Sequence, residues 1–173
     1  MTILEDVNQK AGQHDNIKDY CDAHGIIIRR QKLNCGDYQF PPTITIDTKK
    51  GMAEIYNDIV QDHERFRAEC IRAQEDGTRL IMLIENEDNL HNLVDAENWD
   101  NPRIRKYYKQ YGFIIEAQKR GKMLDAKVPQ PPVSSPRLVG MMNAMSMRYG
   151  VEWAFCRPDE TGQRIVEILS SMR

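Results

Sequence analysis

Hydrophobic residues recur along the chain first with the period of a strand and then with that of a helix, which predicts strands separated by helices. Residues 1–6 form a short apolar run that ends in two acids, and residues 26–33 are rich in β-branched side chains, so both are predicted strands. Residues 43–49 alternate isoleucine with polar side chains, which predicts a strand with one buried face. We expect the strands at 26–33 and 43–49 to pair as an antiparallel hairpin.

Apolar residues at helical spacing predict helices at residues 15–25, 52–60, 62–77, 137–150 and 159–172. Residues 79–85 are continuously apolar, which is typical of a central strand covered on both faces. Residues 151–156 are predicted to extend the sheet in parallel, after a helical crossover. Strands and helices in this order predict an α/β fold with a mixed sheet.

The regular pattern breaks over residues 86–136, which are polar and rich in proline toward their end. We interpret this segment as an excursion from a single domain that spans residues 1–173. It is expected to hold one helix at 101–112, and either to cover a functional face or to be partly mobile.

Composition narrows the class of protein. A length of 173 residues with 40% hydrophobic residues suits one compact domain with a core of its own. No apolar run approaches the length of a membrane span, and the N-terminus lacks the pattern of a secretory signal, so we expect a cytoplasmic protein with no membrane partner. The net charge of −2 argues against polyanion binding by the whole surface but leaves room for a local basic face.

The cysteines are scattered along the chain without a Cys-x-x-Cys pair. This spacing disfavours a zinc ribbon, and a disulfide framework is uncommon in a chain of this length. We therefore predict free, buried thiols at Cys21, Cys35, Cys70 and Cys156.

Asp37, Asp47 and Lys49 form the chemically most informative group of the sequence. Two carboxylates near adjacent strand ends are able to share Mg²⁺, which prefers oxygen ligands and usually takes one or two carboxylates plus substrate phosphate. Lys49 lies two residues after Asp47, on the same face of the predicted strand, where an ammonium stabilises charge on a phosphate. By itself this pattern is weak evidence for a metal site, since two aspartates in turns and a solvent-exposed lysine would give the same sequence.

The order of motifs makes the pattern more specific. The chain has an acid at the end of its first strand ("ILED", 3–6), a Gly-Asp-Tyr turn (36–38), "IDTKK" (46–50), "HERFRAECIRAQ" (63–74) and "LIMLIE" (80–85). This order resembles the XPF-type (ERCC4-like) nuclease domain, a branch of the PD-(D/E)xK nucleases, across nearly the whole chain outside the excursion. The resemblance implies a restriction-endonuclease-like fold, with a mixed central sheet flanked by helices on both faces. The size suggests a small stand-alone bacterial or phage form.

The resemblance also implies roles for individual residues. Asp37 and Asp47 would be metal ligands and catalytic carboxylates, and Lys49 would be the catalytic lysine. Asp6 would bind the metal directly or through water, and the backbone carbonyl of Thr48 would face the same ion. The implied cofactor is Mg²⁺ or Mn²⁺.

Some positions depart from the family pattern. Asp47 stands in place of the usual glutamate, and Thr48 in place of the usual arginine. The acid expected four residues after the lysine is missing, because position 53 is alanine and the acid Glu54 follows it. These departures leave the metal core in place and alter its surroundings. Glu85, at the end of an apolar strand, is a candidate outer acid of the site.

Candidate DNA contacts fall on two basic segments. Arg65, Arg67 and Arg72 lie on a predicted helix, where they either contact the DNA backbone or form a solvated face with neighbouring glutamates. A second group combines cations with Tyr107 and Tyr108. This combination is typical of a surface that binds frayed or single-stranded DNA, but it is also found on a solvent-exposed amphipathic helix. The cations of this second group are Arg103, Arg105, Lys106 and Lys109.

The resemblance implies a metal-dependent, structure-selective endonuclease that hydrolyses phosphodiester bonds in branched or flapped DNA, as in DNA repair or recombination. A homodimer is also expected from it. Two alternatives remain open at this stage. One is a non-catalytic DNA-binding or scaffold subunit of a nuclease or recombination complex, and the other is an unrelated α/β binding protein in which Asp-x-Lys is a coincidence.

Overall fold

The computed structural model describes residues 1–9, 15–41, 43–121 and 126–171. The described residues contain a six-stranded sheet with the strand order β2-β1-β3-β4-β5-β6. Its strands are β1 (Thr2–Asp6), β2 (Ile27–Gln31), β3 (Tyr38–Phe40), β4 (Ile44–Lys49), β5 (Arg79–Glu85) and β6 (Glu152–Cys156). Strand β3 is antiparallel to both β1 and β4, and the other neighbouring pairs are parallel, so the sheet is mixed as predicted.

The predicted hairpin between residues 26–33 and 43–49 is wrong. Strand β2 lies at the sheet edge and pairs with β1 in parallel, so that β1 and β3 separate it from β4. The antiparallel partner of β4 is β3, which begins at Tyr38, inside a segment whose residues are typical of turns. A three-residue strand carries too little periodicity to be recognised from the sequence.

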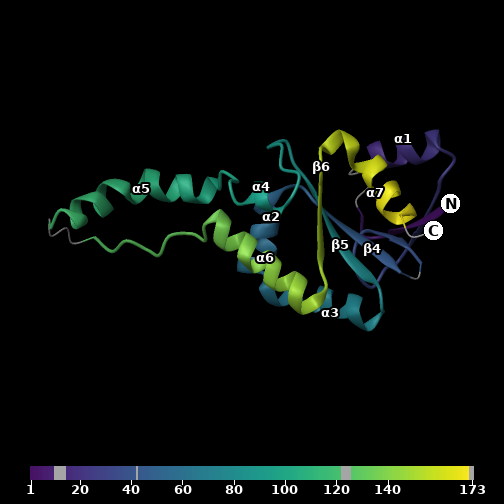
Figure 1. Ribbon diagram of the computed structural model, residues 1–173, viewed down its shortest axis with the longest axis horizontal. Helices are drawn as coiled ribbons and strands as arrows, with labels where there is room; N and C mark the ends of the chain where they lie inside the picture. Colours follow the sequence, from purple (N-terminus) through teal and green to yellow (C-terminus); the bar gives the residue numbers. More distant parts are fainter. Residues whose placement is uncertain (10–14, 42, 122–125, 172–173) are drawn as a thin grey trace.

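Helices cover both faces of the sheet, as expected (Figure 1). One face carries α1 (Asp15–Ala23) and α7 (Thr161–Ser170), which pack against each other. The other face carries α2 (Met52–Tyr56), the π-helix η1 (Asn57–Gln61), α3 (His63–Glu75) and α6 (Ser135–Tyr149). Two short helices, α4 (Leu93–Ala96) and the 3-10 helix η2 (Pro158–Glu160), follow β5 and β6. The predicted inward position of Met172 lies outside the described residues.

Strand β5 shows why the sheet needs two helical layers. Its side chains alternate between the two buried clusters: Met82 and Ile84 pack with α2, α3 and α6, whereas Ile81 and Leu83 pack with α1 and α7. All four are at most 5% exposed, which confirms the prediction of a strand covered on both faces.

Strand β4 departs from its prediction. Its isoleucines are buried as expected, but the opposite face is buried as well, since Thr45 is 0%, Asp47 7% and Lys49 5% exposed. These three residues pair with β5 residues Leu80, Met82 and Ile84, on the side covered by α2, η1 and α3. Tertiary packing therefore places a carboxylate and an ammonium under a helical layer, a position that alternation alone assigns to solvent.

The excursion over 86–136 is dominated by α5 (Pro102–Lys119), which is longer than the predicted helix at 101–112. The Asn101 side chain caps it by accepting a hydrogen bond from the Arg103 amide, and Pro102 fits the first helical position. Figure 1 shows α5 extending away from the sheet, beside a segment that returns toward α6. We call α5 and this returning segment (residues 126–134) the arm.

One further expectation is met within the described residues. All four cysteines are free and buried. The described part of the chain holds no helix with the length and apolar character needed to cross a membrane.

Candidate active site

The sheet register brings the three predicted acids to neighbouring strand ends. Tyr38 lies opposite both Glu5 on β1 and Ile46 on β4. Asp6, Asp37 and Asp47 adjoin these paired residues, and we call them the row of acids. The Asp6 amide donates to the Asp37 carbonyl (2.8 Å), and the Asp37 amide donates to the carbonyl of Ile46 rather than of Asp47 (2.7 Å), so the ladder between β3 and β4 is irregular at this point.

The carboxylate of Asp37 is held in place by Thr48. Its Oδ2 accepts a hydrogen bond from the Thr48 amide at 2.9 Å and a second one from the Thr48 hydroxyl. A serine or threonine is needed for the second bond. The departure from arginine at position 48 thus has a local function, which is to orient the neighbouring metal-ligand candidate.

Gly36 sets the turn that delivers Asp37 to this position. Its φ is +68°, and a Cβ there would lie 2.6 Å from Thr45 Oγ1 and 2.8 Å from the Ile46 carbonyl oxygen. Gly36→Ala is expected to destabilise the protein by roughly 2–5 kcal/mol, from the left-handed backbone and the overpacking together. Chemical denaturation measures this loss, with Gly25→Ala as the control, because Gly25 has a similar φ of +65° and open space around it. Equal losses in the two variants would contradict the steric argument.

Lys49 lies at the centre of a buried ionic cluster. Its Nζ is 2.7 Å from Asp47 Oδ2 and 2.9 Å from Asp58 Oδ2. Asp58 is 2% exposed and lies on the π-helix η1, and its other oxygen contacts Arg65 at 2.6 Å. The cluster runs from a buried strand to the exposed guanidinium of Arg65, whose side chain is 64% exposed.

The electrostatics of the cluster set the charges of its members. Burial lowers the pKa of Lys49, but the carboxylates of Asp47 and Asp58 outweigh it and raise the pKa above its ordinary value. Lys49 therefore remains an ammonium and does not serve as a proton acceptor. Burial raises the pKa of Asp47, and the negative charges of Asp37 and Glu69 add to this effect against the opposing influence of Lys49. The charged form of Asp47 is therefore disfavoured mainly because the carboxylate is removed from water.

Buried donor atoms suit a hard divalent cation. Oδ2 of Asp47 is in ionic contact with Lys49, but it accepts no hydrogen bond of good geometry. Among the described residues, no group of three or more His, Cys, Asp or Glu side chains forms a ready metal cage. Mg²⁺ usually takes one or two carboxylates, with water and substrate phosphate as the remaining ligands, so Asp37 and Asp47 are donors of the right chemical type. The donor set fits Mg²⁺ or Mn²⁺ on this ground.

Two of the other candidate acids make contacts of their own. Asp6 accepts hydrogen bonds from the amide and the side chain of Asn8, both at 3.2 Å. Glu85, at the end of β5, accepts a hydrogen bond from the Thr161 hydroxyl at 2.6 Å and thereby connects the sheet to α7. Glu5 points away from the row of acids, because it contacts the Tyr38 hydroxyl (3.2 Å) and Arg30 (3.1 Å).

The predicted basic residues of α3 separate in the structure. Arg65 is the one that reaches the ionic cluster, through Asp58. Arg67 donates to the Tyr149 hydroxyl on α6 at 3.1 Å, and Arg72 donates to the Asn34 carbonyl at 2.8 Å. The structure thus brings one of these three arginines to the candidate site and ties the other two to neighbouring segments.

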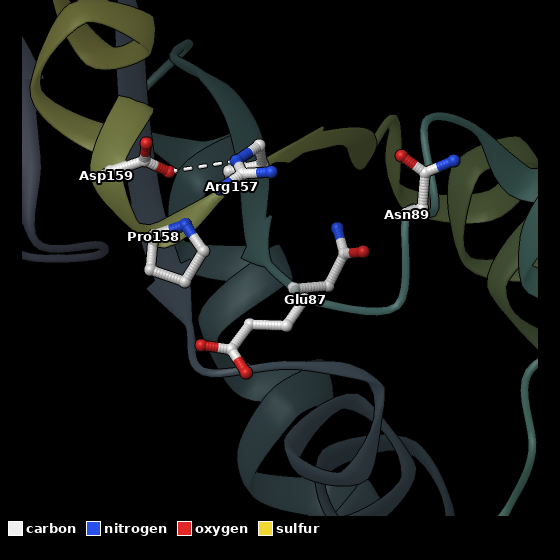
Figure 2. Close-up of a pocket in the computed structure, with 6 residues that line it drawn as sticks. Glu87, Asn89, Arg157, Pro158 and Asp159 are labelled. Atoms are coloured by element: carbon white, nitrogen blue, oxygen red, sulfur yellow. Dashed lines mark hydrogen bonds and ion pairs between the residues drawn. The ribbon is translucent and has the colours of Figure 1, made fainter.

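A separate cavity of about 470 Å³ lies at the carboxyl ends of β5 and β6. Figure 2 shows Glu87, Asn89, Arg157 and Asp159 around it, with Arg157 paired to Asp159 at 3.0 Å. Two acids flank its one cation, and that cation is already paired. The charge around this cavity therefore disfavours a phosphate group.

Sequence reasoning missed Asp58. At α-helical spacing, Asp58 falls at the edge of the apolar stripe that includes Ile55 and Ile59. An acid at this position is predicted to be exposed to solvent. The π-helix that carries it is not visible in the periodicity. Single-turn π segments are often found at functional sites, and this one brings Asp58 onto Lys49.

Comparison with known proteins identifies a related domain. The sequence matches the ERCC4 domain over residues 7–168, a segment that begins one residue after Asp6. Two solved structures share the fold at a TM-score of 0.59 and 15% sequence identity: XPF from Aeropyrum pernix in complex with DNA, and XPF from Aeropyrum pernix. The alignments cover 99% and 98% of this chain, but only 64% and 66% of those chains. No curated protein matches the sequence.

Proposed function

Because the chain belongs to the ERCC4 domain family, we propose that it is a divalent-metal-dependent, structure-selective DNA endonuclease. The observation that carries this proposal is the cluster at the end of β4, where Asp47 and the buried ammonium of Lys49 are 2.7 Å apart beside Asp37. A family match gives the reaction class, and the cluster gives the residues with which this chain would perform it.

Asp37 and Asp47 would hold the ion, and Thr48 would orient the first of them. When bound, Mg²⁺ or Mn²⁺ supplies Lewis acidity toward a phosphoryl oxygen and lowers the pKa of a bound water. Lys49 is a permanent cation at this position, so it would stabilise negative charge that develops on the phosphate. In-line attack by water would then break the phosphodiester bond and leave a 3′-hydroxyl.

The substrate is proposed to be branched or flapped DNA, in the setting of repair or recombination. One of the structures that share this fold is XPF from Aeropyrum pernix in complex with DNA, which supports DNA as the partner. Asp6 would contribute to the metal site from β1, and Arg65 would contact the DNA backbone next to the ionic cluster. A homodimer and a cytoplasmic location complete the proposal.

Labelled flap, fork, four-way-junction and linear DNA, incubated with Mg²⁺, Mn²⁺ or a chelator, test this function. We expect metal-dependent cutting of the branched substrates. Lys49→Ala is expected to lower the rate on the order of 10²- to 10³-fold, because it removes a fixed charge at the reacting phosphate. The matched control is Lys50→Ala, since Lys50 is the next residue and is exposed.

Binding without cutting, at equal affinity in the wild type and the Lys49→Ala variant, would contradict the proposal. That result would favour a non-catalytic DNA-binding subunit instead. Equal losses in the Lys49→Ala and Lys50→Ala variants would show that the position of the charge does not matter. Light scattering of the purified protein at several concentrations measures the proposed dimer.

A further inference from the structure

The arm has one covered face and one open face. The Tyr107 hydroxyl donates to the Pro129 carbonyl at 2.8 Å, and the side-chain amide of Gln118 donates to the Ala126 carbonyl at 3.3 Å. The returning segment therefore packs along α5. The Tyr107 ring contacts the rings of Tyr108 and Tyr111, each at 5.3 Å between centroids. These contacts account for the buried side of the helix and leave its opposite side to solvent (Figure 1).

A large aromatic side chain stands on the open face, where Phe113 is 83% exposed. Tyr108 is 55% exposed but lies about 140° from Phe113 around the helix, beside the buried Tyr107. Lys109 and Lys106 precede Phe113 by one and two helical turns, so both lie on the same face of α5 as its ring. A large apolar ring this exposed is unfavourable in water, and next to cations it indicates a binding surface.

The charge of α5 selects the class of partner. The helix carries five basic residues and one acidic residue, although the whole chain has a net charge of −2. Arg105 pairs with Asp100 and Lys119 pairs with Glu116. Lys106 and Lys109 are exposed and form no ion pair with any residue that the structure describes. The open face is therefore complementary to a polyanion. A protein partner is disfavoured, because lysine is depleted in protein–protein interfaces.

The base of the arm adjoins the candidate active site. The Arg103 guanidinium donates to Asn57 Oδ1 and lies 4.8 Å from the centre of the Tyr56 ring, and the Val133 amide donates to the Tyr56 hydroxyl at 3.1 Å. Asn57 is followed by Asp58, the partner of Lys49. Helix α5 and the returning segment are thus both anchored beside the ionic cluster. The guanidinium of Arg103 is engaged in this anchor and is not free to bind a phosphate.

We propose that the open face of α5 binds single-stranded DNA, with Phe113 stacked on a base and Lys106 and Lys109 on neighbouring phosphates. The proposal rests on the proposed nuclease function and specifies its substrate as DNA with an unpaired strand. Stacking on an aromatic ring requires unstacked bases, which a duplex does not offer. Phe113 follows Arg103 by ten residues of the helix, a distance of about 15 Å, so an unpaired strand that leaves the site has to extend over several nucleotides to reach the ring.

Fluorescence anisotropy in the presence of a chelator tests this inference on the full chain, because no cleavage occurs under this condition. The probes are an oligo-dT of roughly 15 nucleotides, within the usual range of single-strand site sizes, and a blunt duplex of the same length. Phe113→Ala is expected to weaken oligo-dT binding roughly 5- to 100-fold and to leave duplex binding unchanged. Replacing both Lys106 and Lys109 with Gln is expected to reduce the slope of log K against the logarithm of the salt concentration by about 1.4 for oligo-dT, because two phosphate contacts are lost.

Met147→Ala is the control, since Met147 is an 89% exposed apolar residue on α6 rather than on the arm. Unchanged oligo-dT binding by Phe113→Ala, or an equal loss for oligo-dT and duplex, would overturn the inference. So would a Phe113→Ala variant that changes oligomeric state and not DNA affinity, because the face would then join two copies of the chain. A protein that binds oligo-dT through Phe113 but never cuts DNA would support the inference and refute the proposed nuclease activity.

Discussion

Asp47→Asn is expected to lower metal-dependent DNA cleavage on the order of 10³-fold while leaving the protein folded. Loss of a ligand removes several kcal/mol of charge stabilisation from the transition state, and each 1.4 kcal/mol is about a factor of ten. Burial raises the pKa of this carboxyl group, which shows that the fold disfavours its charge. Asp47→Asn keeps a side-chain oxygen that accepts from Lys49, and Asp58 still neutralises this ammonium, so the variant is expected to remain folded.

A thermal melt with and without Mn²⁺ separates metal binding from activity. In the wild type, Mn²⁺ at about 100 times its Kd is expected to add roughly 2.7 kcal/mol to the free energy of unfolding, and in Asp47→Asn this gain is expected to disappear. Asp88→Asn, at an exposed position, is the control. An Asp47→Asn protein that keeps both the Mn²⁺ response and the cleavage rate would exclude Asp47 from the metal site.

Asp58→Ala is expected to destabilise the protein by about 3–5 kcal/mol, the usual cost of removing one partner from a buried ionic cluster. The side chains of Lys49 and Asp58 are only 6% and 3% exposed, so water does not replace the lost partner. Denaturant unfolding measures this effect. A loss below about 1 kcal/mol would mean that Asp47 alone holds the buried ammonium.

Asp58→Asn tests whether Asp58 also positions Lys49 for the reaction. This variant keeps the shape of the side chain, and it is expected to reduce cleavage roughly 10- to 100-fold while the Mn²⁺ response of the melting temperature is retained. Asp62→Asn is the matched control, because Asp62 follows the same π-helix, is exposed and makes no capping bond with its side chain. A variant with full activity would assign Asp58 a purely structural role.

The spacing of Asp37, Asp47 and Lys49 was readable from the sequence because a strand alternates its side chains with a strict period of two. Asp47 and Lys49 were expected on one face of a strand, and both lie on the same face of β4. The central strand β5 was equally clear, since its continuous apolar run has few alternatives. In both cases the information lies within a few consecutive residues.

Asp58 and the order of the strands could not be read in the same way. The position of β2 at the sheet edge depends on its parallel pairing with β1, which joins residues about 25 positions apart. The contact between Asp58 and Lys49 depends on a π-helix folded over β4, and the projection of α5 depends on its anchor at Tyr56 and Asn57. Each of these features is decided by which segments meet in space.

The amino-acid sequence by itself determined the α/β class and the buried central strand, because local periodicity encodes them, and the order of its motifs singled out Asp37, Asp47 and Lys49 as candidates. Only the tertiary structure decided that β4 is buried on both faces, that Thr48 orients Asp37 and that Asp58 completes the ionic cluster. The physical reason is that burial and pairing of charges arise from contacts between elements distant along the chain, on which local pattern carries no information.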